Sequence, residues 1–248
     1  MERKKNILIL GLFLLTGIVA PAGVAAEKQE IYRAYVSNRM ELWKKVIDAM
    51  EAQKPADNDK LAELVNYQYG YIGYCIGFKL RDEAKKYLAL AEKNIDILES
   101  RNHDKSEVNA YRCAFYGFRI GLNKLSAPVN GLKSIDHAKK AIELDPDNYF
   151  AWIQYGNIQF YMPSTFGGSK QEGIGYFLKA RKMIEKDRAG LKDNWNYLSL
   201  LVIIGQSYTY TGELESARAI YEEIMRIEPG FLYVRDELLP ELLNKMKN

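Results

Sequence analysis

The sequence contains few of the residues from which catalytic and metal centres are built. Two histidines, His103 and His137, are present among 248 residues, and one aspartate stands beside each, Asp104 and Asp136. A metal site usually needs three or four converging ligands, so neither pair forms a site by itself. The motifs G-x-S-x-G, H-E-x-x-H and G-x-x-x-x-G-K-S/T are also absent. We therefore expect no enzyme activity, no catalytic residue, no metal and no cofactor.

A surplus of basic charge is lacking too. The formal net charge is +3, and residues 1–26 contribute +2 of it through Arg3, Lys4, Lys5 and Glu2. The rest of the chain carries 32 basic and 31 acidic residues, a net charge of +1. Proteins that bind nucleic acid usually show a clustered basic excess, so we expect no nucleic-acid partner.

The sequence has one long apolar run, and it lies at the start of the chain. The basic stretch Arg3–Lys5 precedes an apolar run of 14 residues, Ile7–Ala20, and small residues follow up to Ala26. This layout is typical of a secretory signal peptide, and the run is shorter than the roughly 20 residues that span a bilayer. We predict a signal peptide over residues 1–26 that is cleaved after Ala26; a retained anchor is the alternative.

Cleavage would leave an exported protein, in the periplasm or secreted, because no later stretch is long and apolar enough to cross a membrane. Two cysteines, Cys75 and Cys113, lie in aromatic-rich segments of the mature chain. We expect small buried side chains at both positions. An exported compartment permits a disulfide between them, and the sequence leaves that pairing open, as it does the oligomeric state.

Strand patterns are absent from residue 27 onward, where helical periodicity is continuous. Met40, Trp43, Ile47 and Met50 share one face of a first helix that ends near Lys54. Short links and turn signals divide the remainder into roughly ten helices in all, and we expect one all-α domain over 27–248, a solenoid of antiparallel helix pairs. The predicted ranges after the first helix are about 57–79, 81–100, 105–122, 134–144, 149–161, 170–185, 194–211, 213–227 and 232–246.

An internal repeat is clearest near the end of the chain. Over residues 197–229, Gly205 precedes Ala217 by 12 residues, Tyr221 follows 4 later, and Pro229 follows 8 after that. This resembles a tetratricopeptide repeat (TPR), with its pattern W-x2-L-G-x2-Y…A-x3-F…P over 34 residues. Small residues let the paired helices approach closely, the ring fills the space beside them, and proline ends the second helix.

The preceding unit, over residues 144–186, resembles the same family. Trp152, Tyr155 and Gly156 match its first helix, and Gly173 and Phe177 match its second. Gly156 and Gly173 are 17 residues apart, so five extra residues lie in the turn that contains Pro163–Gly168. Phe166, Gly167 and Gly168 in this insert have two interpretations. Either Phe166 folds back over the neighbouring hairpin, which we favour, or the insert meets a ligand.

Together with the predicted signal peptide and the missing catalytic motifs, the resemblance implies an exported, non-catalytic scaffold that holds a protein or peptide partner in a concave groove. The groove-lining candidates are Tyr67, Tyr71 and Tyr74, at i, i+4 and i+7 on one helical face, together with Gln154 and the insert residues. Packing between helices is the alternative role for the rings. A second hypothesis is a small-ligand or transport-accessory protein, in which glycines of the first helices leave room for a cavity (Gly70, Gly73, Gly77, Gly117 and Gly121).

Overall fold

The computed structural model describes residues 22–247, and it consists of α-helices joined by short turns. The predicted signal peptide, residues 1–26, lies outside the described residues except for its last five, which begin α1; its cleavage stays a prediction. The helices are α1 (Ala22–Val36), α2 (Met40–Gln53), α3 (Asn58–Gly77), α4 (Arg81–Ser100), α5 (Lys105–Leu122), α6 (Ala127–Leu144), α7 (Tyr149–Tyr161), α8 (Lys170–Ile184), α9 (Trp195–Thr211), α10 (Leu214–Ile227) and α11 (Leu239–Lys245), with a π-helical turn at Val234–Leu238 before the last.

Side-chain caps fix where the inner helix of a pair begins. Asp57, Asp104, Asn148 and Asn194 precede α3, α5, α7 and α9, and each side chain accepts a hydrogen bond from a backbone N–H of the first turn. Such caps satisfy donors that the helix itself leaves without partners. The four inner helices therefore start at turns rich in Asp and Asn.

The predicted helices are confirmed, and α4, α5 and α7 have the predicted bounds. Two larger differences concern the first helical segment and α6. The first helical segment is two helices, because the chain turns at Asn38 (φ 52°), a residue type that tolerates left-handed backbone. Helix α6 begins at Ala127 instead of 134, and Pro128 lies in its first turn. Backbone N–H groups of a first turn make no hydrogen bond within the helix, so proline, which lacks this group, is tolerated there.

Within a pair, a glycine on one helix admits a ring from the other. A Cβ atom at Gly156 of α7 would lie 2.6 Å from the Phe177 ring of α8. Gly205 of α9 is covered in the same way by the Tyr221 ring of α10. The repeat positions identified in the sequence therefore interlock as the family pattern requires.

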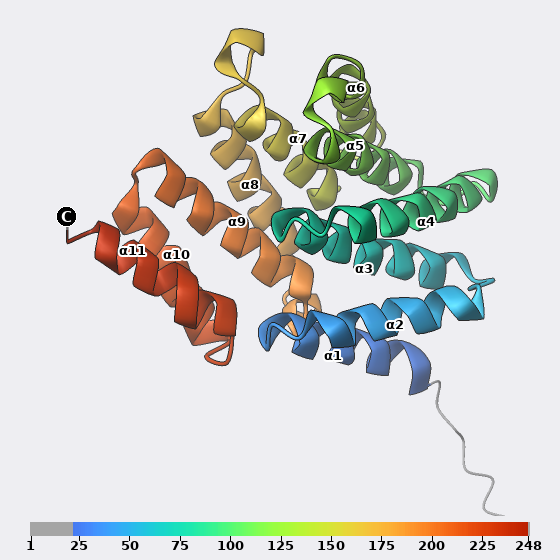
Figure 1. The fold of residues 1–248 in the computed structure, drawn as a ribbon, viewed down its shortest axis with the longest axis horizontal. Coiled ribbons are helices and arrows are strands. Elements are labelled where there is room, and N and C mark those ends of the chain that lie inside the picture. The colour runs from blue at the N-terminus through green and yellow to red at the C-terminus, as the bar shows by residue number, and fades with distance from the viewer. Residues whose placement is uncertain (1–21, 248) are drawn as a thin grey trace, which may run out of the picture.

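The solenoid curls until its first pair meets its last repeat (Figure 1), with α1 touching α9. Aromatic rings fill this contact. The Trp43 and Trp195 indoles lie 4.8 Å apart between centroids, and Tyr35 is 6.0 Å from each and 4.9 Å from Phe231. A Cβ atom at Gly70 would lie 2.6 Å from Trp43 and 2.8 Å from Trp195. The expectation that Gly70 leaves room for a cavity is wrong, because the two indoles occupy that space.

No helix within residues 22–247 is both long and apolar enough to cross a membrane. The four residues predicted to share a face of the first helical segment, Met40, Trp43, Ile47 and Met50, are all buried on α2. They contribute to one continuous core that extends from α1 to α11. These four residues therefore belong to the same core as buried residues of the later helices.

Candidate functional site

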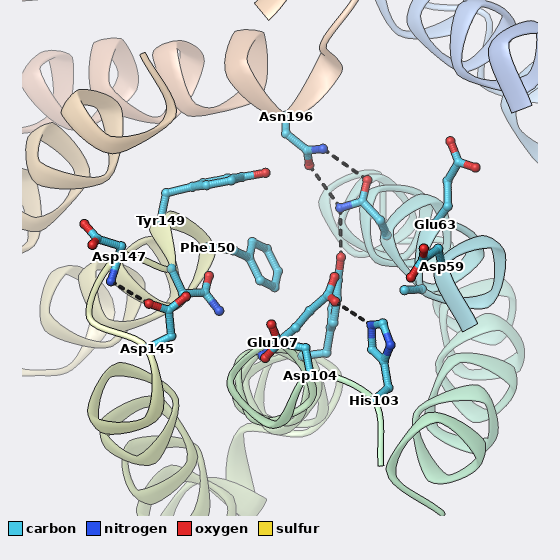
Figure 2. Close-up of a pocket in the computed structure, with 14 residues that line it drawn as sticks. Asp59, Glu63, His103, Asp104, Glu107, Asp145, Asp147, Tyr149, Phe150 and Asn196 are labelled. Carbon is cyan, nitrogen blue, oxygen red and sulfur yellow. Dashed lines mark hydrogen bonds and ion pairs between the residues drawn. The ribbon is translucent and has the colours of Figure 1, made fainter. Parts of the chain in front are cut away.

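A pocket of about 530 Å³ opens where the first turns of the four inner helices converge (Figure 2). Helix α3 contributes Asp59, Ala62, Glu63 and Asn66, and α9 contributes Asn196. The remaining lining comes from the α4–α5 turn with α5 and from the α6–α7 turn with α7: His103, Asp104, Glu107, Tyr111, Asp145, Asp147, Asn148, Tyr149 and Phe150.

The lining is strongly acidic. It holds the six carboxylates of Asp59, Glu63, Asp104, Glu107, Asp145 and Asp147, and the described lining contains no lysine or arginine. In Figure 2 the α6–α7 carboxylates lie on the opposite side of the pocket from those of α3. The positive ends of the helix dipoles point toward this region and stabilise negative charge there. The pocket therefore concentrates negative charge although the chain is almost neutral.

A hydrogen-bonded amide pair, Asn66 and Asn196, forms part of the pocket lining. Asn66 and Asn196 bond each other reciprocally, at 3.1 Å and 3.2 Å. The Asn66 Nδ2 also donates to the Tyr111 hydroxyl at 2.9 Å, and the Asn66 Oδ1 accepts from the Trp195 Nε1 at 3.0 Å. This network joins α3, α5 and α9, so it holds three inner helices at fixed separation.

Two of the carboxylates are partly desolvated. Burial raises the pKa of Glu107, and the hydrogen bond from His103 Nε2, 2.9 Å away, lowers it in part. Burial likewise raises the pKa of Glu63, which accepts a hydrogen bond from the Tyr67 hydroxyl and lies near Glu27. A raised carboxyl pKa means that the surroundings disfavour the negative charge. A cation entering the pocket would relieve that cost.

The six carboxylates are distributed over α3, the α4–α5 turn with α5, and the α6–α7 turn. Among the described residues, no group of three or more His, Cys, Asp or Glu side chains is placed to hold a metal ion. Two of the acids already serve the backbone, since Asp104 accepts from the N–H groups of Ser106 and Glu107, and Asp145 accepts from that of Asp147. An ammonium or guanidinium group on a long stem could reach several of the separated carboxylates in turn.

The residues predicted from the sequence do not line this pocket. Tyr67, Tyr71 and Gln154 are buried between helices, and their contact with a partner stays a prediction. The Tyr71 ring packs edge-on against Tyr87 of α4 at 4.9 Å, and the Gln154 Nε2 donates to the hydroxyl of the half-buried Tyr69 of α3. Tyr74 is partly buried beside Tyr71, and its contact with a partner stays a prediction. The face of α3 that carries Tyr71 therefore packs against the neighbouring helix α4.

The insert forms a short 3₁₀ turn over Ser164–Phe166. The Phe166 side chain is 76 % exposed, so the favoured expectation that it folds over the neighbouring hairpin is wrong. Gly167 has φ +92°, and Gly168 lies against the Met162 carbonyl oxygen so closely that no Cβ atom would fit. The two glycines thus have a backbone role, while partner contact by this insert stays a prediction.

The cysteines are separate free thiols. Cys75 and Cys113 are both buried, and the Cys113 Sγ lies 3.3 Å from the Ser134 hydroxyl. Burial raises the pKa of Cys75 to about 11 and that of Cys113 to about 12. Burial therefore disfavours the thiolate, which is the reactive form of cysteine, at both positions.

These elements define an α-solenoid with a TPR-type fold, and known structures share it. The chain is similar to a thermophilic TPR protein of Thermus thermophilus, TTC0263, with 15% identity and a TM-score of 0.54 over 88% of this chain and 99% of that one. It is also similar to the HusA haemophore from Porphyromonas gingivalis, with 17% identity and a TM-score of 0.61 over 77% of this chain and 97% of that one. No protein-family model and no curated protein sequence matches the chain. At these identities the similarities describe the fold.

Proposed function

We propose that the protein is an exported, non-catalytic binding scaffold that holds a basic segment of a peptide or protein partner. The observation that carries this proposal is the pocket at the inner-helix starts, with its six carboxylates and no cationic side chain in its described lining. Folds of this type present surfaces to partners and typically have no catalytic role. The partner class follows from the charge of the pocket.

Lysine or arginine side chains suit the pocket in length and in chemistry. An extended segment can place an ammonium group near Glu63 and Asp59 while Tyr149 and Phe150 contact its apolar stem. Hydrogen bonds to charged groups each contribute about 1.5–3 kcal/mol. Two such contacts supply about 3–6 kcal/mol, less than the about 8.2 kcal/mol of a micromolar complex, so a micromolar affinity needs several basic side chains of one segment to bind together.

The test is fluorescence anisotropy with residues 27–248 and two labelled peptides of equal length, one rich in lysine and one rich in glutamate. We expect the lysine peptide to bind and its affinity to fall as salt is added. The double variant Asp59→Asn/Glu63→Gln should weaken binding about tenfold or more, since 1.4 kcal/mol is a factor of ten.

The matched control is Glu215→Gln/Glu237→Gln, which removes two exposed acids from α10 and the π-helical turn, outside the pocket lining. It should leave the affinity unchanged. Equal affinity for both peptides, or equal loss in the pocket and control variants, would refute recognition of a basic segment by this pocket.

Export is the second part of the proposal, and it rests on the layout of residues 1–26. The intact mass of the protein isolated from its native cells measures it directly. A chain that begins at Glu27 supports export with cleavage after Ala26. A chain that retains the first 26 residues would exclude cleavage and favour an anchored protein.

Small-ligand carriage is a second candidate, favoured by the shared fold with a haemophore. Haem carries two propionates, and the acidic lining of the pocket would repel them, so haem would have to bind elsewhere on this chain. Absorbance titration of residues 27–248 with haemin tests this candidate. A saturable shift of the Soret band that survives Asp59→Asn/Glu63→Gln supports it, and an unshifted band excludes it.

A further inference from the structure

An apolar stripe lies unpartnered on the outer side of the fold, between the end of α5 and the first half of α6. Leu125, Val129 and Leu132 are 90 %, 61 % and 66 % exposed, the largest exposures among aliphatic side chains in the described chain. Leu125 lies in the 3₁₀ turn Lys124–Ser126 that runs directly into α6, and Val129 and Leu132 follow on one side of α6. The opposite side of α6 packs on α5 through Ser134, Ala138 and Ala141. The stripe therefore stands outward as a ridge.

From Lys124 to Leu144 lysines outnumber acids by four to two, and the exposed Asp136 lies on the same face as the stripe, one turn beyond Leu132. The sequence contains no Asp or Glu between Glu107 and Asp136, while Lys124 and Lys133 stand at either end of the stripe. Neither lysine makes an ion pair with any described residue, although the Lys133 Nζ lies 5.5 Å from the Tyr116 ring. Exposed aliphatic tips between unpaired ammonium groups are the composition of surfaces that lie in the headgroup layer of a bilayer.

We propose that this stripe, residues 124–133, docks the protein on an anionic lipid surface. The three aliphatic side chains enter the interface between headgroups and acyl chains. Lys124 and Lys133 meet lipid phosphates on either side, and their long stems allow the ammonium groups to remain at the polar level. The acidic pocket is built from the opposite ends of the inner helices, α3 and α5 included, so docking leaves it away from the negative lipid.

Charge complementarity favours lipid over a second copy of the chain. In a two-fold dimer formed through this stripe, Lys124 and Lys133 would face the same two lysines of the other copy. The stripe is also a ridge of three side chains, whereas a specific protein interface usually involves about 20–30 residues a side. A soft, negatively charged surface accepts such a ridge without a complementary groove.

The test is co-sedimentation of residues 27–248 with vesicles, because the run Ile7–Ala20 would itself bind lipid. One vesicle preparation contains phosphatidylglycerol and phosphatidylcholine, and the other contains phosphatidylcholine alone. We expect sedimentation with the first that weakens with salt, and little with the second. Leu125→Ser/Leu132→Ser should reduce the partition coefficient about tenfold or more, and Lys124→Glu/Lys133→Glu should abolish the preference for anionic vesicles.

The control pair Leu144→Ser/Ile227→Ser changes two exposed aliphatic residues away from the stripe and should sediment like the unchanged chain. The substituted side chains are exposed, so every variant should keep its helical circular dichroism. Absence of sedimentation with anionic vesicles, or equal loss in the control pair, overturns the proposal. So does a concentration-dependent dimer that Leu125→Ser/Leu132→Ser removes in the absence of lipid, since the stripe would then be a protein interface.

Discussion

Truncating Asn66 to alanine should destabilise the protein by about 2–4 kcal/mol. Asn66 makes four hydrogen bonds, which join α3 to Tyr111 of α5 and to Trp195 and Asn196 of α9. In Asn66→Ala the buried Trp195 Nε1 and the Tyr111 hydroxyl lose a partner, and each buried unsatisfied group costs about 1–3 kcal/mol. Asn196 lines the pocket and can bond water instead, so it adds little to the loss.

Urea unfolding followed by circular dichroism measures this difference at a shared m-value. The control is Asn130→Ala on the outer helix α6, which should change stability by less than about 0.5 kcal/mol. A double-mutant cycle with Trp195→Phe isolates the bond between the two side chains, and we expect a coupling of about 1 kcal/mol. A loss below about 0.5 kcal/mol in Asn66→Ala would refute the view that this amide fixes the spacing of the inner helices.

Three further predictions concern packing, thiols and pH. Gly205→Ala should cost about 1–3 kcal/mol in the same urea assay, because a methyl group would overlap the Tyr221 ring. Cys75 and Cys113 should react with an aromatic disulfide reagent only after unfolding, and a bond between them would appear as a mass increase on reduction. Burial lowers the pKa of His137, so the unfolded chain takes up a proton that the folded chain excludes. Stability should therefore fall as pH decreases below about 6.5, and His137→Asn should flatten that dependence.

Much of the fold could be predicted because its determinants are local. Caps such as Asp104 and Asn148 and the periodic apolar positions lie within one helix, and they give helix bounds directly. The small-residue and ring positions of the last repeat, Gly205 and Tyr221, identified the pairing because they recur at a family spacing. Proline shows the limit, since it follows the end of α10 at Pro229 but lies in the first turn of α6 at Pro128.

The pocket could not be predicted from the tyrosine pattern. Helical periodicity shows that several tyrosines share one face of a helix, but it does not show whether that face contacts another helix or a partner. Tyr71 faces α4, whereas the pocket is formed by polar residues that follow turns. A usable signal was present, since Asp59, Asp104 and Asp145 each stand at the start of an inner helix or in the turn before it. Recognising that these starts converge required the superhelical curvature, which depends on contacts between residues more than 100 positions apart, such as that of Asn66 with Asn196.

The contact of Trp43 with Trp195 has a consequence for how the chain comes apart. In an open solenoid each repeat touches only its neighbours, so the array can fray from either end. Here the first helix pair also contacts the last repeat, through the rings of Tyr35, Trp43, Trp195 and Phe231. Neither end of the array is therefore without a neighbour on its outer side. Unfolding of the first pair would expose Trp195 and Phe231 to solvent, and unfolding of the last repeat would expose Tyr35 and Trp43. Unfolding should therefore be one cooperative event, with amide protons of α1 and α10 exchanging at similar rates instead of in a gradient along the array.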